Sequence, residues 1–284
     1  MAKKVAEQLV DTLIEAGVRR IYAVTGDSLN EVNEAVRQNE AMKWIHVRHE
    51  ETGAYAAGAE AQLTGLPGCC AGSSGPGHVH LINGLYDAHR SGAPVIAIAS
   101  TIPTGEFGTE YFQETNTVKL FNDCSFYNEV ATTPEQFPRM LQSALQTATT
   151  RKGVAVVGLP GDLAKKPAVK VESSEQIYPL ASSVCPAEED LIRLAGMLNH
   201  YERITLFCGI GCKGAHEEII RMSETLNAPV AYTFKGKMEV QYDNPYEVGS
   251  DWPAGRCPRA YYSMHEAEVL VMLGTDFPYS AFLP

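Results

Sequence analysis

Residues 68–99 read GCCAGSSGPGHVHLINGLYDAHRSGAPVIAIA, and this stretch decides the fold class. Small residues over 68–74 predict a tightly packed strand, which the turn Gly75-Pro76-Gly77 ends. A helical pattern follows over 78–89, and the wholly apolar run 94–99 is typical of a strand buried on both faces of a parallel sheet. A strand, a helix and a strand in this order predict a βαβ unit.

The same alternation extends to both sides of this unit. Apolar residues at helical spacing over 5–14, a helix over 50–62 and a helix over 135–149 alternate with short apolar runs. These runs predict further strands at 21–24, 44–47 and 154–159. We therefore expect residues 1–164 to form a complete doubly wound parallel-sheet domain.

A second domain is expected after a break in this rhythm. Residues 165–186 hold three prolines, clustered lysines and a Glu/Ser-rich stretch, and they predict an interdomain linker. A helix over 188–199 and three strands, at 204–208, 229–234 and 268–273, then predict a second parallel-sheet domain over 187–284. Three strands make a thin sheet for such a domain, so we expect this α/β domain to be truncated.

Composition limits the class of protein. Of the 284 residues 45% are hydrophobic, which suffices for a packed core and excludes wholesale disorder. The 23 basic and 34 acidic residues give a net charge of −11, which argues against nucleic-acid binding and against an anionic membrane surface. No apolar run reaches the roughly 18 residues of a membrane span. Seven cysteines, an odd count, favour free thiols in a reducing cytoplasm.

The segment Arg48-His49-Glu50-Glu51 lies where a strand ends and a helix begins. Ligands bind outside the carboxyl ends of strands in open parallel sheets, so a carboxyl group here could handle a proton. Glutamates in a first helical turn also complement the helix dipole. Both interpretations stay open on the residues alone, and the glycine turn at residues 75–77 is a weak motif of its own.

Residues 209–215 read GIGCKGA and match the glycine pattern of a dinucleotide-binding loop. A nicotinamide site also needs an acidic residue at the end of the next strand, where this chain has Thr233-Phe234-Lys235. Another dinucleotide remains open. No metal site is predicted, because Cys208 and Cys212 are C-x₃-C without a second pair, and Cys69-Cys70 are typical of core residues.

Seven segments, taken in order, resemble the thiamine-diphosphate-dependent pyruvate oxidase and quinone-dependent pyruvate dehydrogenase family. The resemblance covers nearly the whole chain, and the ordered set is far more specific than any one segment. The segments are Val24-Thr25-Gly26-Asp27-Ser28-Leu29-Asn30, Arg48-His49-Glu50-Glu51, Ala56-Ala57-Gly58-Ala59-Glu60, Gly75-Pro76-Gly77, His80-Leu81-Ile82-Asn83-Gly84-Leu85, Phe112-Gln113-Glu114 and Leu159-Pro160-Gly161-Asp162.

The resemblance implies that the first domain binds the aminopyrimidine ring of thiamine diphosphate. Glu50 would share a proton with a ring nitrogen, which favours the tautomer that can deprotonate the thiazolium carbon. Phe112 and Gln113 fall on the family's active-site loop, and His80 borders the pocket. The other residues implied on this cofactor are Gly26, Gly75, Pro76, Gly77 and Asn83.

The second domain would correspond to the family's FAD-binding domain. Where relatives place a Thr-Gly pair, this chain reads Ser250-Asp251-Trp252-Pro253-Ala254-Gly255, which is a departure from the family pattern. The residues implied on the flavin side are Gly209, Gly211, Gly214, Asp251, Trp252, Pro253, Ala254, Gly274, Thr275, Asp276 and Phe277.

The family's third domain binds the diphosphate through magnesium with a Gly-Asp-Gly…Asn-Asn motif, which this chain lacks. We therefore expect an N-terminal portion of a longer enzyme, with the Mg²⁺ ligands and a membrane-contacting tail outside it. The expected reaction converts pyruvate to acetate and passes electrons through FAD to a quinone, in a dimer or tetramer. Acetolactate synthesis, a catalytically silent fragment and, least favoured, a nicotinamide dehydrogenase are the alternatives.

Overall fold

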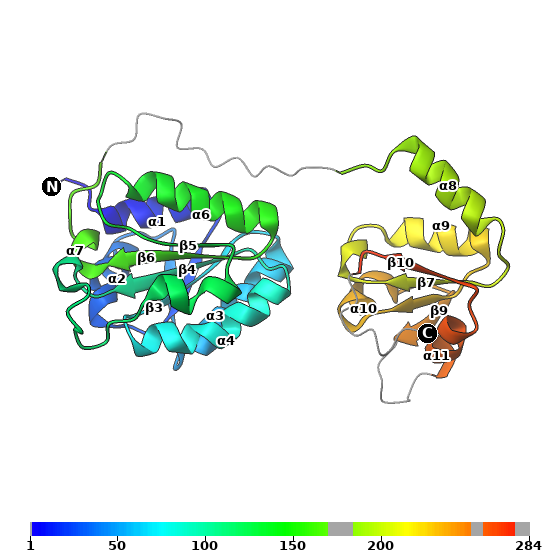
Figure 1. Cartoon of the computed structure of the whole chain (residues 1–284), viewed down its shortest axis with the longest axis horizontal. Coiled ribbons are helices and arrows are strands. Elements are labelled where there is room, and N and C mark those ends of the chain that lie inside the picture. Colours follow the sequence, from blue (N-terminus) through cyan, green and yellow to red (C-terminus); the bar gives the residue numbers. More distant parts are fainter. Residues whose placement is uncertain (1, 170–183, 251–257, 276–284) are drawn as a thin grey trace. The chain divides into compact units, whose positions relative to one another are not determined.

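A computed structural model describes residues 2–169, 184–250 and 258–275 (Figure 1). The chain divides into two compact units, Met1–Ser183 and Val184–Pro284. Both units are α/β, and every pair of neighbouring strands within their sheets is parallel. The expected fold class is therefore confirmed.

The first unit has a six-stranded sheet in the order β2-β1-β3-β4-β6-β5. Its two central strands are wholly buried because helices cover both faces. The strands are β1 (Arg20–Ala23), β2 (Lys43–His46), β3 (Gly68–Gly72), β4 (Val95–Thr101), β5 (Tyr127–Val130) and β6 (Val154–Pro160).

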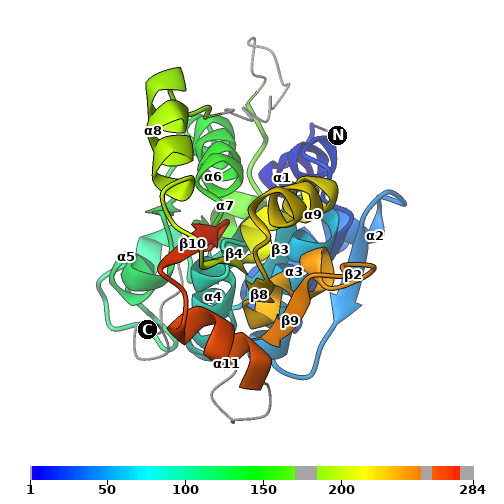
Figure 2. The same ribbon diagram turned by 90° about the vertical axis from the view of Figure 1, so that its right-hand side faces the viewer.

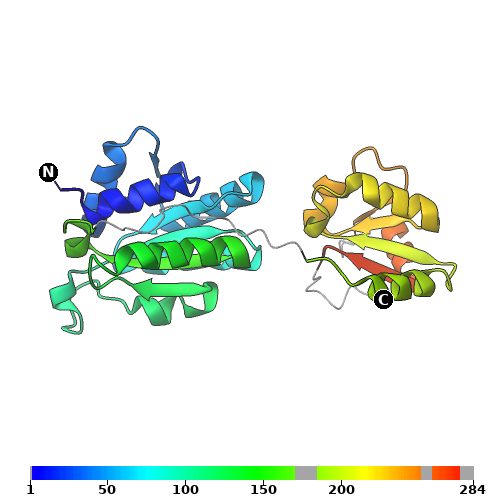
Figure 3. The same ribbon diagram turned by 90° about the horizontal axis from the view of Figure 1, so that it is seen from above.

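Two groups of helices cover the two faces of this sheet. One core cluster joins the sheet to α1 (Val5–Glu15), α2 (Asn30–Arg37), α6 (Phe137–Arg151) and α7 (Gly161–Ala164). Figure 3 shows the blue α1 and the green α6 on the same face. The other cluster joins the opposite face to α3 (Glu50–Thr64), α4 (Pro76–Arg90) and the segment after α5 (Thr117–Leu120). Short 3-10 turns lie at Asp27–Leu29, Thr104–Glu106 and Asn122–Cys124.

The second unit has a four-stranded sheet in the order β10-β7-β8-β9. Helix α9 covers one face and α11 the other, each through its own core cluster (Figure 2). The elements are α8 (Glu188–Leu198), β7 (Ile204–Cys208), η4 (Ile210–Cys212), α9 (His216–Leu226), β8 (Val230–Tyr232), η5 (Phe234–Gly236), α10 (Lys237–Val240), β9 (Glu247–Ser250), α11 (Pro258–His265) and β10 (Val269–Leu273).

Two edge strands differ from the sequence expectation. β5 and β9 were not predicted, and the second sheet has four strands where three were expected. Both are four residues long and only partly buried, so neither carries the apolar run that marks a central strand. Pairing with one neighbour, rather than intrinsic pattern, holds them in the sheets.

Residues 165–169 pack against the start of the chain. The amide of Val5 donates to the carbonyl oxygen of Lys166 at 3.0 Å, and the amide of Ala168 donates to that of Lys3 at 2.7 Å. This part of the expected linker therefore belongs to the first unit, and 170–183 lie outside the described residues. Within the described ranges, each helix is too short or too polar to serve as a transmembrane span.

Helices α3 and α4 approach each other closely through small residues. A Cβ added to Gly84 would lie 2.6 Å from the Cβ of Ala54 and 2.7 Å from the carbonyl oxygen of Glu51. A Cβ added to Gly58 would lie 3.2 Å from the Cβ of Ala88. These contacts leave no room for a larger side chain along the seam, and they bring the first turns of the two helices together.

We expect Gly84→Ala to destabilise the first unit, because the added methyl group must push α3 and α4 apart. Overpacking of this kind costs about 1–3 kcal/mol of unfolding free energy. Urea unfolding measures it. Gly105→Ala is the matched control, since a Cβ at Gly105 meets nothing within 4 Å and should change stability by less than about 1 kcal/mol. Equal effects of the two substitutions would contradict the close seam.

Candidate active site

Glu50 is the first residue of α3 and is only 7% exposed. His49 caps the helix, with its Nδ1 accepting a hydrogen bond from the amide of Glu51 at 3.3 Å. Acidic side chains are rarely buried without a partner, so the surroundings of Glu50 determine what its carboxyl group can do.

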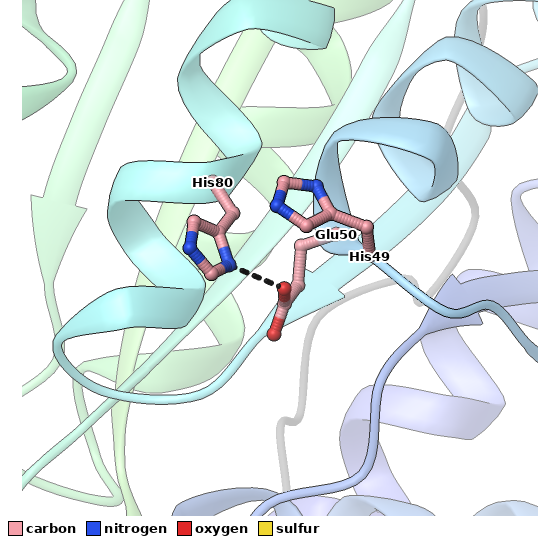
Figure 4. Close-up of side chains that lie close together, drawn as sticks. All are labelled: His49, Glu50 and His80. Carbon is pink, nitrogen blue, oxygen red and sulfur yellow. Dashed lines mark hydrogen bonds and ion pairs between the residues drawn. The ribbon is translucent and has the colours of Figure 1, made fainter.

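His80, on the second turn of α4, provides that partner. Its Nδ1 lies 2.9 Å from Oε2 of Glu50, and the nitrogen donates because a carboxylate only accepts (Figure 4). The His80 ring stacks on His49 with 4.2 Å between centroids. Ligand atoms of the three side chains lie within 4.8 Å of one another, so this cluster could also hold a metal ion.

The turn at residues 75–77 lies beside this pair. Oε1 of Glu50 is 3.2 Å from where a Cβ on Gly77 would stand. Gly75 has φ +72°, a left-handed conformation that favours glycine, and its missing Cβ would lie 2.8 Å from the Cβ of Gln113. The loop that carries Gln113 therefore packs directly on the turn, next to the carboxyl group of Glu50.

The loop between β4 and α5 is anchored at both ends. At its start, the amide and hydroxyl of Thr104 donate to Asp162 at 2.9 and 2.7 Å. These two hydrogen bonds hold the pKa of Asp162 below its usual value, against the opposing effect of its partial burial. At its end, Thr115 bonds to His78. Phe112, between the anchors, is 84% exposed.

His78 is fully buried and neutral. Its Nε2 lies 2.8 Å from the carbonyl oxygen of Ser100, which can only accept, so Nε2 carries the hydrogen. Nδ1 must then accept, and the hydroxyl of Thr115 donates to it at 2.6 Å. Burial lowers the pKa of His78 to about 4, with the Ser100 bond as a smaller opposing effect.

The structure brings together only some of the predicted residues. Glu50, His80, Gln113 and the turn 75–77 meet at one place, and Gly26 packs on Ser73 at the neighbouring ends of β1 and β3. Asn83 donates to Glu51 rather than to Glu50. Phe112 faces solvent. The roles of His49 and of the His78–Thr115 pair were not predicted.

In the second unit, the predicted glycine loop packs on another loop. A Cβ on Gly209 would lie 2.4 Å from the carbonyl oxygen of Gly274 and 2.5 Å from the Cβ of Thr275. A Cβ on Gly211 would lie 2.7 Å from the Cα of Gly274. Gly214 has φ +82°, and a Cβ there would have no neighbouring atom within 4 Å. Close backbone packing thus accounts for Gly209 and Gly211. The other predicted flavin residues, Asp251, Trp252, Pro253, Ala254, Asp276 and Phe277, lie outside the described residues.

Comparisons with known proteins identify the family. Residues 3–120 match the thiamine pyrophosphate enzyme, N-terminal TPP binding domain, and residues 191–283 match the thiamine pyrophosphate enzyme, central domain. An uncharacterized 42.6 kDa protein of Pseudomonas amyloderamosa is 49% identical over 99% of this chain and 71% of its own length. The chain belongs to the thiamine pyrophosphate enzyme family. The Glu50 cluster lies within the N-terminal match.

Two further relatives of the chain carry names that state an activity. A pyruvate oxidase of Lactiplantibacillus plantarum is 34% identical over 93% of the chain, and an acetolactate synthase of Arabidopsis thaliana is 28% identical over 97%. The chain spans 44% and 42% of their respective lengths. It therefore matches less than half of either enzyme.

The buried His78 predicts a pH dependence of stability. Its folded pKa of about 4 lies below the ordinary 6.5, so the folded state resists its protonation. The stability it provides is complete above about pH 6.5 and falls as the pH drops towards 4, by about 3 kcal/mol in all. Urea unfolding across that range should show the stability of the wild type fall, relative to that of His78→Gln, by this amount.

The variants are matched for this comparison. Glutamine at 78 can donate to Ser100 and accept from Thr115 but does not titrate. His46→Gln, at an exposed position of β2, is the control and should keep the wild-type pH profile. A constant difference between wild type and His78→Gln across the range would show that folding does not lower the pKa of His78.

Proposed function

We propose that this chain contributes the pyrimidine-binding and central domains, 1–164 and 187–284, to an enzyme that oxidatively decarboxylates pyruvate to acetate. This enzyme would use thiamine diphosphate and FAD as cofactors and a quinone as the electron acceptor. One observation carries it: the Glu50 carboxyl group is buried at a helix start, with Oε2 bonded to His80 and Oε1 beside the glycine turn.

The residues fit the aminopyrimidine ring of thiamine diphosphate. A flat heterocycle needs a carboxyl group at its edge, and Glu50 presents one beside the backbone of the turn at residues 75–77. When bound, the cofactor supplies a carbon nucleophile for a keto group and a sink for the electrons that decarboxylation releases.

Each side chain then has a distinct role. Glu50 would hold a proton at Oε1 for the ring nitrogen, and His80 would orient the carboxyl group through Oε2. Gln113, packed on the turn, borders the place of the reacting atoms, whereas the exposed Phe112 would contact substrate only if the loop folds over it. The proposal assigns no Mg²⁺ ligand to this chain.

The oxidase reaction is favoured over acetolactate synthesis by two observations. The pyruvate oxidase is the more similar of the two named relatives. The segments at 26–30 and 112–114 also resemble the oxidase family. FAD rests on that resemblance, because packing already accounts for Gly209 and Gly211. A dimer or tetramer that completes each site between subunits, in the cytoplasm, is part of the same proposal.

The test is Glu50→Gln in the protein that contains this chain. Glutamine cannot share the proton, so we expect the kcat for pyruvate to fall by about 10²–10⁴-fold, the usual contribution of such a group. Glu51→Gln is the matched control, because it makes the same chemical change at the neighbouring residue. The oxygen of glutamine at 51 can still accept the hydrogen bond from Asn83. Full turnover by Glu50→Gln would overturn the mechanism.

Product analysis separates the alternatives. Pyruvate is supplied with thiamine diphosphate, Mg²⁺, FAD and a quinone. Acetate formation supports the proposal, and acetolactate formation supports the carboligase. Calorimetry of the chain with thiamine diphosphate and Mg²⁺ addresses the third possibility. No binding, and no turnover of pyruvate, would identify a catalytically silent chain.

A further inference from the structure

The loop between β4 and α5 holds Gln113 in a strained backbone conformation. Gln113 has φ +69°, which lies in the left-handed region that residues with a side chain rarely occupy. Such a conformation costs free energy, and it persists only where the surrounding structure holds it in place. The contacts made by this part of the loop therefore determine where the Gln113 side chain lies.

Two contacts hold the loop here, and both involve the start of α4. The missing Cβ of Gly75 would lie 2.8 Å from the Cβ of Gln113 and 3.1 Å from its Cα, so the loop rests on the glycine. Two residues further along, Oγ1 of Thr115 donates to Nδ1 of His78 at 2.6 Å. The amide of His78 in turn donates to the carbonyl oxygen of Gly75 at 3.1 Å. Both contacts therefore share one support, the turn that begins α4.

The His78 ring is itself fixed within the first unit. It is fully buried, its Nε2 donates to the carbonyl oxygen of Ser100 on β4 at 2.8 Å, and the Phe121 ring packs against it edge-on. Because Nε2 carries the hydrogen of the neutral ring, Nδ1 can only accept, and the Thr115 hydroxyl group is the donor that it meets. A hydroxyl group at position 115 thus couples the loop to the sheet through a buried ring.

The part of the loop around Gln113 is also bonded to itself. The amide of Gly108 donates to Oε1 of Glu114 at 2.8 Å, and the amide of Glu114 donates to the carbonyl oxygen of Tyr111 at 2.9 Å. We expect the segment 108–114 to move as one piece for this reason. The bond between Thr115 and His78 is the side-chain bond that fastens this piece to α4 at its C-terminal end.

We propose that His78 and Thr115 are positioning residues that keep the Gln113 side chain beside the turn at residues 75–77 during the reaction of the Glu50 site. Neither residue touches the substrate or the cofactor. Both act through Gln113, whose place beside the reacting atoms belongs to the function proposed above, so this inference rests on that function. A displacement of about 1 Å in such a group can lower a rate by about 10²-fold.

Amide hydrogen exchange of the whole chain tests the contact without any cofactor. Thr115→Val keeps the shape of the side chain but removes the donor, which leaves Nδ1 of the buried His78 without a partner. We expect the amides of Gly108 and Glu114 to exchange about tenfold faster in this variant, while those of β4 exchange as in the wild type.

Two further threonine variants make this comparison specific. Thr115→Ser keeps the hydroxyl group and should restore the wild-type exchange rate. Thr109→Val is the matched control, because it makes the same chemical change in the same loop. The Thr109 hydroxyl group bonds within the loop, to Glu106, and makes no bond to α4. We therefore expect Thr109→Val to leave the exchange of the Glu114 amide within about twofold of the wild type.

Turnover of pyruvate by the protein that contains this chain gives the second measurement. In Thr115→Val the kcat should fall by about tenfold or more, because Gln113 is displaced. The affinity for thiamine diphosphate should stay at the wild-type value, because Glu50 and His80 keep their bond. His78→Leu should lower the kcat as well. Adding Thr115→Val to it should then change the kcat by less than about twofold, because the bond between the two residues is already absent.

Three results would overturn the proposal. Wild-type exchange of the loop in Thr115→Val, or equally fast exchange in Thr109→Val, would show that the bond to His78 does not hold the loop. A wild-type kcat in Thr115→Val, despite faster exchange, would show that the reaction does not depend on this position of the loop. A wild-type protein that does not turn over pyruvate would instead refute the function proposed above, whereas each of these three results refutes the positioning role alone.

Discussion

The site depends on the close contact of two helices that carry small residues along their shared seam. Gly84 against Ala54 and Gly58 against Ala88 set how near α3 comes to α4. Glu50 begins the first helix and His80 lies one turn into the second, so their 2.9 Å bond exists only at this separation. Small residues along the seam bury less apolar surface than larger ones would, but they fix the place of the Glu50 carboxyl group. One of its oxygens is hydrogen-bonded to His80 and the other lies beside Gly77.

Two histidines of one helix show how burial divides chemical tasks. His80 is partly exposed and pairs with a carboxyl group, whereas His78, two residues earlier, is enclosed by Ser100, Thr115 and Phe121. Desolvation keeps His78 neutral, and only a neutral ring can donate from one nitrogen while accepting at the other. His78 therefore links the end of β4 to the end of the loop that carries Gln113. His80 instead donates its hydrogen bond to the Glu50 carboxyl group.

Much of the fold could be predicted because its central strands are buried on both faces and are apolar throughout. Glu50 could be singled out because a strand end followed by a helix start is where parallel sheets place ligands. β5 and β9 could not, since a short edge strand carries little pattern. The His78–Thr115 bond joins residues 37 positions apart, so it depends on how a loop folds back. Gly209 and Gly211 were ambiguous in principle, because glycine serves phosphate binding and close backbone packing equally.

The buried polar groups indicate how chemistry is divided between the units. Among the described residues of the second unit, the buried Thr205, His216 and Ser223 each bond to a backbone carbonyl group of the same unit, which is a structural use. Nothing there matches Glu50, whose second oxygen faces the glycine turn of the first unit. Among the described residues, a buried carboxyl group beside a glycine turn is therefore a feature of the first unit. What the second unit adds is a crowded loop in which Gly209 and Gly211 pack against Gly274 at the carboxyl ends of β7 and β10, so the backbone of one loop fixes that of the other.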